Sequence, residues 1–223
     1  MPGLPPASLM VVCPALAALL FQLWRSGRES AISLLARMFD FRRLRFPLAV
    51  VLLLLLNPVS FAISLAIQRS LGVAVPLPTS IRPFPLLGLF CVFLVAAVCE
   101  ELGWSGYALG RLQSRLGEVL AGLTIGLVWA LWHFVPLAEA GRSIEWISWW
   151  SLWTSATRVI MVWLYNRTGR SVFGISLYHA ASNVCWQIYP VRGSYFDPTI
   201  SALVTVGFAA ILIRPRHFKR RKS

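Results

Sequence analysis

Two adjacent carboxylates, Glu100 and Glu101, end a long apolar run in a chain that has only eight acidic residues. Two of its three histidines, His133 and His179, also lie in apolar segments, and Asn183 follows His179 by four residues. A charged side chain at the centre of a bilayer costs about 2.5–3.5 kcal/mol on insertion scales, so such residues face a cavity or a partner and are candidates for function. These five residues are therefore the first candidates for chemistry.

Residues four apart on a helix share a face, so His179 and Asn183 should project into one site. Adjacent residues diverge by about 100°, and we expect one of Glu100 and Glu101 to face that site while the surrounding structure holds the other. At about 1.5 Å per residue, the predicted helices carry these groups and His133 to similar depths. A carboxylate there can activate water for attack on an amide bond, and the histidines and the amide can donate hydrogen bonds to the oxyanion.

Each polar residue also has a purely structural interpretation. His133 alone would fit a histidine bonded to a backbone carbonyl, and Asn183 alone would fit a contact between packed helices. The glutamate pair would fit a proton or ion relay in a transporter. The shared depth of the groups favours a single site, because unrelated structural groups have no reason to lie at one level.

The composition predicts an all-α, polytopic bundle of transmembrane helices in one domain, residues 1–223. The chain is 57% hydrophobic, contains ten tryptophans and has a mean hydropathy of +0.69, which is too apolar for a soluble domain of this length. About 20 apolar residues are needed to cross the hydrocarbon layer. The sequence predicts about seven spans, at 7–24, 46–67, 84–110, 119–137, 146–165, 172–188 and 199–213. Pro14 interrupts the first and the last is short, so six is the alternative count.

The net charge of +13 does not indicate nucleic-acid binding, because the basic residues stand in short clusters between apolar runs. Sixteen of them fall in alternate connections and the C-terminal tail, against four in the remaining connections. By the positive-inside rule we expect a multi-pass protein of a bacterial cell membrane, with its N-terminus outside and its C-terminus in the cytoplasm. Residues 28–46 fit either an interfacial helix or a solvated basic loop, and 214–223 form a basic cytoplasmic tail.

Three motifs carry a resemblance to a known family. They are Glu100-Glu101-Leu-Gly-Trp-Ser, Trp129-Ala-Leu-Trp-His133 and His179-Ala-Ala-Ser-Asn183, in order on separate predicted spans within about 84–188. With them the sequence resembles the CPBP family of intramembrane endopeptidases, also called the Abi family. The family pattern is Glu-Glu-x-x-x-Arg, then aromatic-x-x-x-His, then His-x-x-x-Asn or Asp. Members include type II CAAX prenyl endopeptidases and bacteriocin-processing or immunity proteins.

The resemblance implies that Glu100 activates water, and that His133, His179 and Asn183 bind or polarise the scissile carbonyl. Members are often called metalloproteases, and the resemblance leaves a divalent metal such as zinc open. Its ligands would be Glu100, His133 and His179. The chain has no His-Glu-x-x-His stretch, so such a site would be assembled from separate helices.

One residue departs from the family pattern, since Ser105 stands where the motif has arginine. If the motif arginine pairs with the second glutamate, Glu101 needs another cation. Arg158 is the only basic residue deep in a predicted span, and we expect it to pair with Glu101 in a supporting role. The alternative is that Arg158 extends to the lipid headgroups from a shorter helix.

These observations predict an intramembrane endopeptidase that hydrolyses membrane-associated proteins or peptides with glutamate-activated water. The expected partners are membrane lipid and a peptide or protein-tail substrate, and no nucleic acid is expected. The alternative is a non-catalytic scaffold or bacteriocin-immunity protein that retains the protease fold. A transporter ranks third, because the sequence shows no repeated halves with broken helices. The residues leave the substrate's identity, any prenyl requirement and the oligomeric state open.

Overall fold

The chain folds into a bundle of α-helices in the computed structural model, which describes residues 10–44, 47–76 and 83–214. The helices are α1 (Cys13–Ala36), α2 (Pro47–Ser70), α3 (Pro83–Glu101), α4 (Leu109–Glu139), α5 (Ile144–Arg167), α6 (Val172–Ile188) and α7 (Pro198–Ile213). A π-helical segment (Leu102–Ala108) joins α3 to α4, and no strand occurs in the described ranges. The predicted all-α architecture is confirmed, and the predicted spans follow the helices in the same order, except that 84–110 covers α3, the π-helical segment and the first two residues of α4.

Three continuous helical stretches are long and apolar enough to cross a membrane. They are Met10–Phe39, Val50–Ser70 and Pro83–Glu139, and the last of them contains α3, the π-helical segment and α4. Helix α7 is also apolar but shorter. The protein is therefore an integral membrane protein, while the count of seven spans and the sidedness stay predictions.

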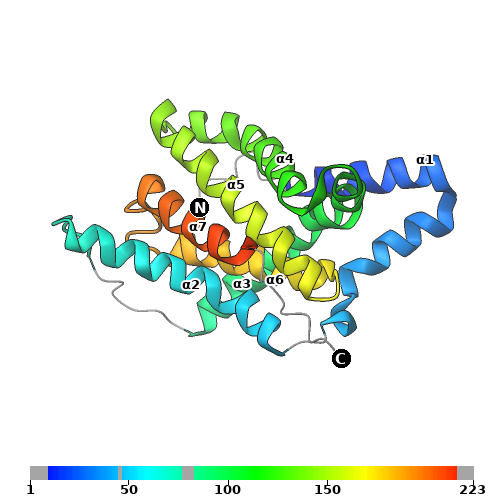
Figure 1. The fold of residues 1–223 in the computed structure, drawn as a ribbon, viewed down its shortest axis with the longest axis horizontal. Helices are drawn as coiled ribbons and strands as arrows, with labels where there is room; N and C mark the ends of the chain where they lie inside the picture. Colours follow the sequence, from blue (N-terminus) through cyan, green and yellow to red (C-terminus); the bar gives the residue numbers. More distant parts are fainter. Residues whose placement is uncertain (1–9, 45–46, 77–82, 215–223) are drawn as a thin grey trace, which may run out of the picture.

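Helix α5 is the centre of the bundle. It packs against α4 on one side and α7 on another, while α6 packs against α2 and α3 (Figure 1). Every residue of α5 from Trp153 to Tyr165 is buried. A helix that is covered on all sides belongs to a protein core. Helix α5 can therefore carry polar residues that would be costly on a surface facing lipid.

Helices α4 and α5 approach each other closely at two glycines. A Cβ atom added at Gly126 would lie 2.7 Å from Ser155 Cα, and one added at Gly122 would lie 3.1 Å from Val159 Cα. Small residues at such positions let two helix backbones come together within a membrane protein. The contact also brings Trp129, three residues after Gly126, against the buried face of α5.

The predicted interfacial helix at 28–46 is helical only in its first half. Helix α1 bends at Gly27, whose φ of 79° lies in the left-handed region that favours glycine (Figure 1). The second arm of α1 ends at Ala36, and two short 3₁₀ turns follow at Arg37–Phe39 and Phe41–Arg43. Residues 45–46 lie outside the described part of the chain. Location of this segment at a membrane surface stays a prediction.

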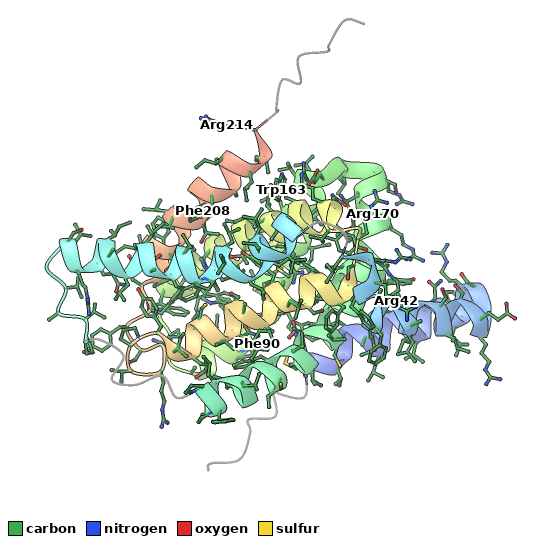
Figure 2. The ribbon with its side chains drawn as sticks, turned by 90° about the horizontal axis from the view of Figure 1, so that it is seen from below. Arg42, Phe90, Trp163, Arg170, Phe208 and Arg214 are labelled. Atoms are coloured by element: carbon green, nitrogen blue, oxygen red, sulfur yellow. The ribbon has the colours of Figure 1, made fainter. Side chains whose placement is uncertain are left out.

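Asp40, between the two 3₁₀ turns, caps the N-terminus of α6. Its Oδ2 accepts a hydrogen bond of 3.1 Å from the Val172 backbone N–H, and its Oδ1 accepts one of 3.0 Å from Phe173. A carboxylate is favourable at this end of a helix, because the first backbone N–H groups have no helical partner. The segment after α1 is thus held against the core helix that carries His179. The predicted C-terminal tail lies outside the described residues after Arg214, where the ribbon leaves α7 (Figure 2).

Gly126→Ala should destabilise the bundle, because the added methyl group would push Ser155 and α5 away from α4. Overpacking of this kind costs about 1–3 kcal/mol, which outweighs the gain of about 1 kcal/mol that alanine has over glycine in a helix. We expect a lower midpoint of thermal unfolding in detergent. Gly207→Ala is the matched control, because nothing lies within 4 Å of a Cβ at that position in α7. Equal midpoints for the two variants would contradict the close contact.

Candidate active site

The two glutamates lie at the junction of α3 and the π-helical segment, and both are buried. Glu101 is fully inaccessible and Glu100 is 7% exposed. The π-helical geometry begins at the next residue, Leu102, and single π turns of this kind are frequent at functional sites. Gly103 within it packs directly on the backbone of Pro14 in α1, where a side chain would collide. The junction is therefore tightly enclosed, and its carboxylates are held away from lipid.

Glu101 forms a buried ion pair with Arg158 of α5. Arg158 Nη1 lies 2.8 Å from both carboxylate oxygens, and neither side chain is more than 1% exposed. Ser105 Oγ donates a further hydrogen bond to Oε2, and His179 Nδ1 lies 3.0 Å from Oε1. The pairing predicted for Arg158 is thus present in the structure. A carboxylate with this many donors is held as an anion by its surroundings.

Trp129 of α4 connects the two glutamates. Its indole Nε1 donates a 3.1 Å hydrogen bond to Glu100 Oε2, and the guanidinium carbon of Arg158 lies 4.4 Å from the centroid of its ring. The cation over the aromatic face is stabilised by the ring quadrupole. Although Glu100 and Glu101 diverge on their helix, both are therefore joined to one cluster.

Both histidines of the apolar segments contact the same indole. The ring centroids of His133 and His179 lie 5.3 and 5.0 Å from that of Trp129, each in an edge-on arrangement. His133 Nδ1 is 2.8 Å from the Trp129 carbonyl oxygen. Carbonyl and carboxylate oxygens only accept here, so Nδ1 carries a proton in both rings and Nε2 is the remaining functional nitrogen. We call Glu100, Glu101, Trp129, His133, Arg158 and His179 the Trp129 cluster.

Asn183 lies one helical turn beyond His179 on α6 and is half-buried. No direct hydrogen bond between described residues joins Asn183 or His133 to either carboxylate. The structure thus brings Glu100, Glu101 and His179 into one bonded cluster through Trp129 and Arg158, with Asn183 beside it. The roles of these residues in chemistry stay predictions.

Two contacts of the cluster were absent from the sequence interpretation. These are the hydrogen bond from Trp129 to Glu100 and the one from Ser105 to Glu101. The available signal for the first was the spacing Trp129-x-x-x-His133, which places an indole and an imidazole on one helix face. For the second it was the spacing of four between Glu101 and Ser105.

The metal ligands predicted from the sequence, Glu100, His133 and His179, all belong to the Trp129 cluster. No group of three or more His, Cys, Asp and Glu side chains within the described ranges is arranged to hold one. The Nδ1 atoms of His133 and His179 are already engaged with Trp129 and Glu101. Both Nε2 atoms remain free of hydrogen bonds to described residues, so a metal held by Glu100, His133 and His179 stays a prediction, and no step below runs through a metal.

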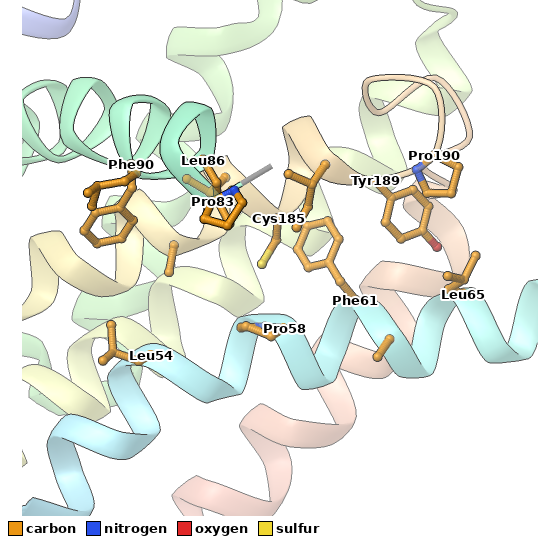
Figure 3. Close-up of a pocket in the computed structure, with 15 residues that line it drawn as sticks. Leu54, Pro58, Phe61, Leu65, Pro83, Leu86, Phe90, Cys185, Tyr189 and Pro190 are labelled. Atoms are coloured by element: carbon orange, nitrogen blue, oxygen red, sulfur yellow. The ribbon is translucent and has the colours of Figure 1, made fainter. Parts of the chain in front are cut away.

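An apolar cavity of about 580 Å³ lies on the side of α6 that faces α2 and α3. Figure 3 shows Phe61 of α2, Phe90 of α3 and Cys185 of α6 around it, with Tyr189 at one end. Its wall on α6 begins at Ala181, two residues after His179. At about 100° per residue Ala181 lies on a different face of α6 from His179, and no residue of the Trp129 cluster lines the cavity.

Arg158→Leu should strongly destabilise the protein, because Glu101 would be left as a buried charge without its cation. Removing one partner of a buried ion pair typically costs about 3–5 kcal/mol. Adding Glu101→Gln to that variant should recover part of the loss, as a coupled pair requires. Resistance to thermal unfolding in detergent measures both effects.

Arg167→Leu is the matched control, since it removes a more exposed pair with Glu118, which is worth about 0–1 kcal/mol. Additive losses from Arg158→Leu and Glu101→Gln would show that the two side chains are not coupled.

Comparison with known proteins agrees with the geometry of the site. Residues 82–185, which contain the whole Trp129 cluster and Asn183, match the family model of the Rce1-like type II CAAX prenyl endopeptidases. The chain is also 27% identical to CAAX prenyl protease 2 of Methanococcus maripaludis, in an alignment that covers 80% of this chain and 73% of that protein. The motifs, the cluster that they form and these similarities lead to one conclusion: residues 82–185 are similar to the Rce1-like type II CAAX prenyl endopeptidases.

Proposed function

We propose that this intramembrane protease hydrolyses a peptide bond near the C-terminus of a membrane-associated protein or peptide, with Glu100 as the base that activates water. The observation that carries the proposal is the difference between the two glutamates. Glu101 is occupied by Arg158, Ser105 and His179. Glu100 receives one hydrogen bond from a described residue, from the Trp129 indole to Oε2. Its Oε1 is therefore available to take a proton.

The proposed reaction is a direct attack by water. Glu100 accepts a proton from water as its oxygen adds to the scissile carbonyl carbon, and an oxyanion forms. The Asn183 amide can donate to that oxyanion at any protonation state, and His179 can donate through Nε2 when its ring carries both protons. Protonated Glu100 then returns the proton to the leaving amine as the carbon–nitrogen bond breaks. In its neutral form the His133 ring can accept from water through Nε2 and orient it.

The substrate class that we propose is a tail ending in Cys-a-a-X with a prenyl group on the cysteine. A related protein is called a CAAX prenyl protease, and the apolar cavity of about 580 Å³ (Figure 3) is within the usual size range of ligand pockets. A prenyl chain would occupy this cavity, because its lining is almost entirely apolar. The alternative of a non-catalytic scaffold is less favoured, since Arg158 restores the cation that Ser105 lacks.

Glu100→Gln should abolish cleavage while preserving the fold, because glutamine cannot accept the proton but can still accept the Trp129 hydrogen bond. Loss of a general base lowers rates by about 10²–10⁴-fold. The assay is hydrolysis of a prenylated peptide by protein reconstituted in lipid vesicles. Glu139→Gln, at the exposed end of α4, is the matched control. Cleavage by Glu100→Gln at the control rate would refute the proposed base, and a folded parent protein that cleaves no such peptide would favour the scaffold.

Trp129→Phe should lower kcat about tenfold with little change in KM, because it removes one hydrogen bond to Glu100 and keeps an aromatic ring. Trp150→Phe is the comparison, because the buried Trp150 Nε1 has no hydrogen-bond partner among the described residues. Steady-state kinetics of both variants give the answer. The idea fails if the two variants have the same kcat, or if the Trp129 variant changes only KM.

A further inference from the structure

A second cavity lies at the end of the bundle where α5 ends and α6 begins, and it is polar. Its volume is about 950 Å³, and four arginines line it together with polar residues of the π-helical segment, α4 and α5. The arginines are Arg37, Arg43, Arg167 and Arg170. Figure 2 shows Arg42 and Arg170 toward the same end of the bundle. By the charge pattern of the loops this end is the predicted cytoplasmic one.

The arginines that line the cavity carry more positive charge than its carboxylates neutralise. Arg167 is paired with Glu118 at 2.8 Å, whereas Arg43 and Arg170 form no ion pair with any residue in the described ranges. Arg37 is held in place by neutral acceptors, donating at 2.8 Å to the Gly106 and Arg170 carbonyl oxygens. Its nearest carboxylate is that of Asp40, at 3.9 Å. An anion entering the cavity would therefore meet guanidinium groups with donors to spare.

The cavity extends inward to a residue that contacts the Trp129 cluster. Ser105 and Gly106 form part of its wall, and Ser105 Oγ donates to Glu101 within the Trp129 cluster. A surface patch that collects lipid headgroups would have no reason to extend this far into the bundle. The polar cavity therefore reaches a residue that is hydrogen-bonded to the Trp129 cluster.

The spacing along α6 matches the dimensions of a peptide tail. Arg170 lies just before helix α6, which begins at Val172. His179 lies seven residues after Val172, a distance of about 10 Å at 1.5 Å per residue. Three extended residues also span about 10 Å, the length from the scissile carbonyl of a Cys-a-a-X tail to its terminal carboxylate. Beyond His179 the apolar cavity begins at Ala181. The order along α6 is thus cations, cluster and apolar cavity.

We infer that the polar cavity binds the C-terminal carboxylate of the substrate tail, with Arg43 and Arg170 as its binding residues and Arg37 as their support. The inference rests on the proposed function for the nature of the tail. A carboxylate held at this end would place the bond three residues before it at about the level of His179 along α6. The cavity would then select the length of the tail between the scissile bond and the carboxylate. A tail with additional residues would put a different bond at the cluster.

The test compares two peptides that differ only in the last group. One is a fluorescent prenylated peptide ending in Cys-a-a-X with a free carboxylate, and the other has a C-terminal amide. Binding to the Glu100→Gln protein in bilayer discs of neutral lipid is measured by fluorescence anisotropy, so that no cleavage interferes. We expect the free acid to bind about tenfold more tightly than the amide.

An Arg43→Gln/Arg170→Gln variant, in the same background, should lose the preference for the acid and leave binding of the amide unchanged. Both side chains are exposed, so the substitutions should not disturb the fold. Arg28→Gln/Arg115→Gln is the matched control, because these two arginines are exposed on the same predicted side and do not line the cavity. The control should retain the tenfold preference.

Two results would overturn the inference. One is equal affinity for the acid and the amide in the parent protein. The other is equal weakening of both peptides by Arg43→Gln/Arg170→Gln together with tighter binding of anionic lipid by the parent, which would make the cavity a headgroup site. Cleavage of the acid peptide is measured separately, with protein in which Glu100 is intact. If this protein cleaves the peptide but the Glu100→Gln protein does not bind the acid more tightly than the amide, only the inference is refuted. If the Glu100→Gln protein binds the acid more tightly but the intact protein does not cleave it, only the proposed function is refuted.

Discussion

The buried ion pair between Arg158 and Glu101 is the interaction on which the rest of the site depends. Removing two charges from water is expensive, and their attraction offsets that cost only with good geometry and further hydrogen bonds. Here one guanidinium nitrogen lies 2.8 Å from both carboxylate oxygens, while Ser105 and His179 supply the additional contacts. The pair joins α3 to α5, and the contact of His179 with Glu101 adds α6.

The same pair separates the roles of two adjacent and chemically identical residues. Glu101 has its charge compensated and its oxygens occupied, which favours the supporting role predicted for it. Glu100 has a single neutral donor, the Trp129 indole, among the described residues. A general base must have an oxygen free within reach of the water that it deprotonates. Serine at position 105 is compatible with this division, because the cation has moved to another helix while the hydroxyl keeps a hydrogen bond to the anion.

Much of this arrangement follows from residue types and spacing, and some of it does not. The all-α bundle and the Arg158 pair were predictable because a hydrocarbon layer penalises any charge that lacks a partner. The bond from Trp129 to Glu100 was not, since helical spacing gives the face of a side chain but not which atom it contacts on another helix. The bend at Gly27 and the cap formed by Asp40 were also missed. The bend and the cap depend on which distant segment packs against residues 28–46. The pattern of apolar residues within 28–46 does not contain that information. The two cavities likewise arise from the packing of separate helices.

Burial of α5 on all sides has a consequence for how the enzyme is made. Its central part carries Thr154, Ser155, Thr157 and Arg158, and an isolated helix with such residues is poorly accommodated by lipid. It becomes stable only when α4 and α7, the neighbours that cover it, are both in place. Helix α7 follows α6 in the chain, so the covering of α5 is complete only after all the described helices have been made.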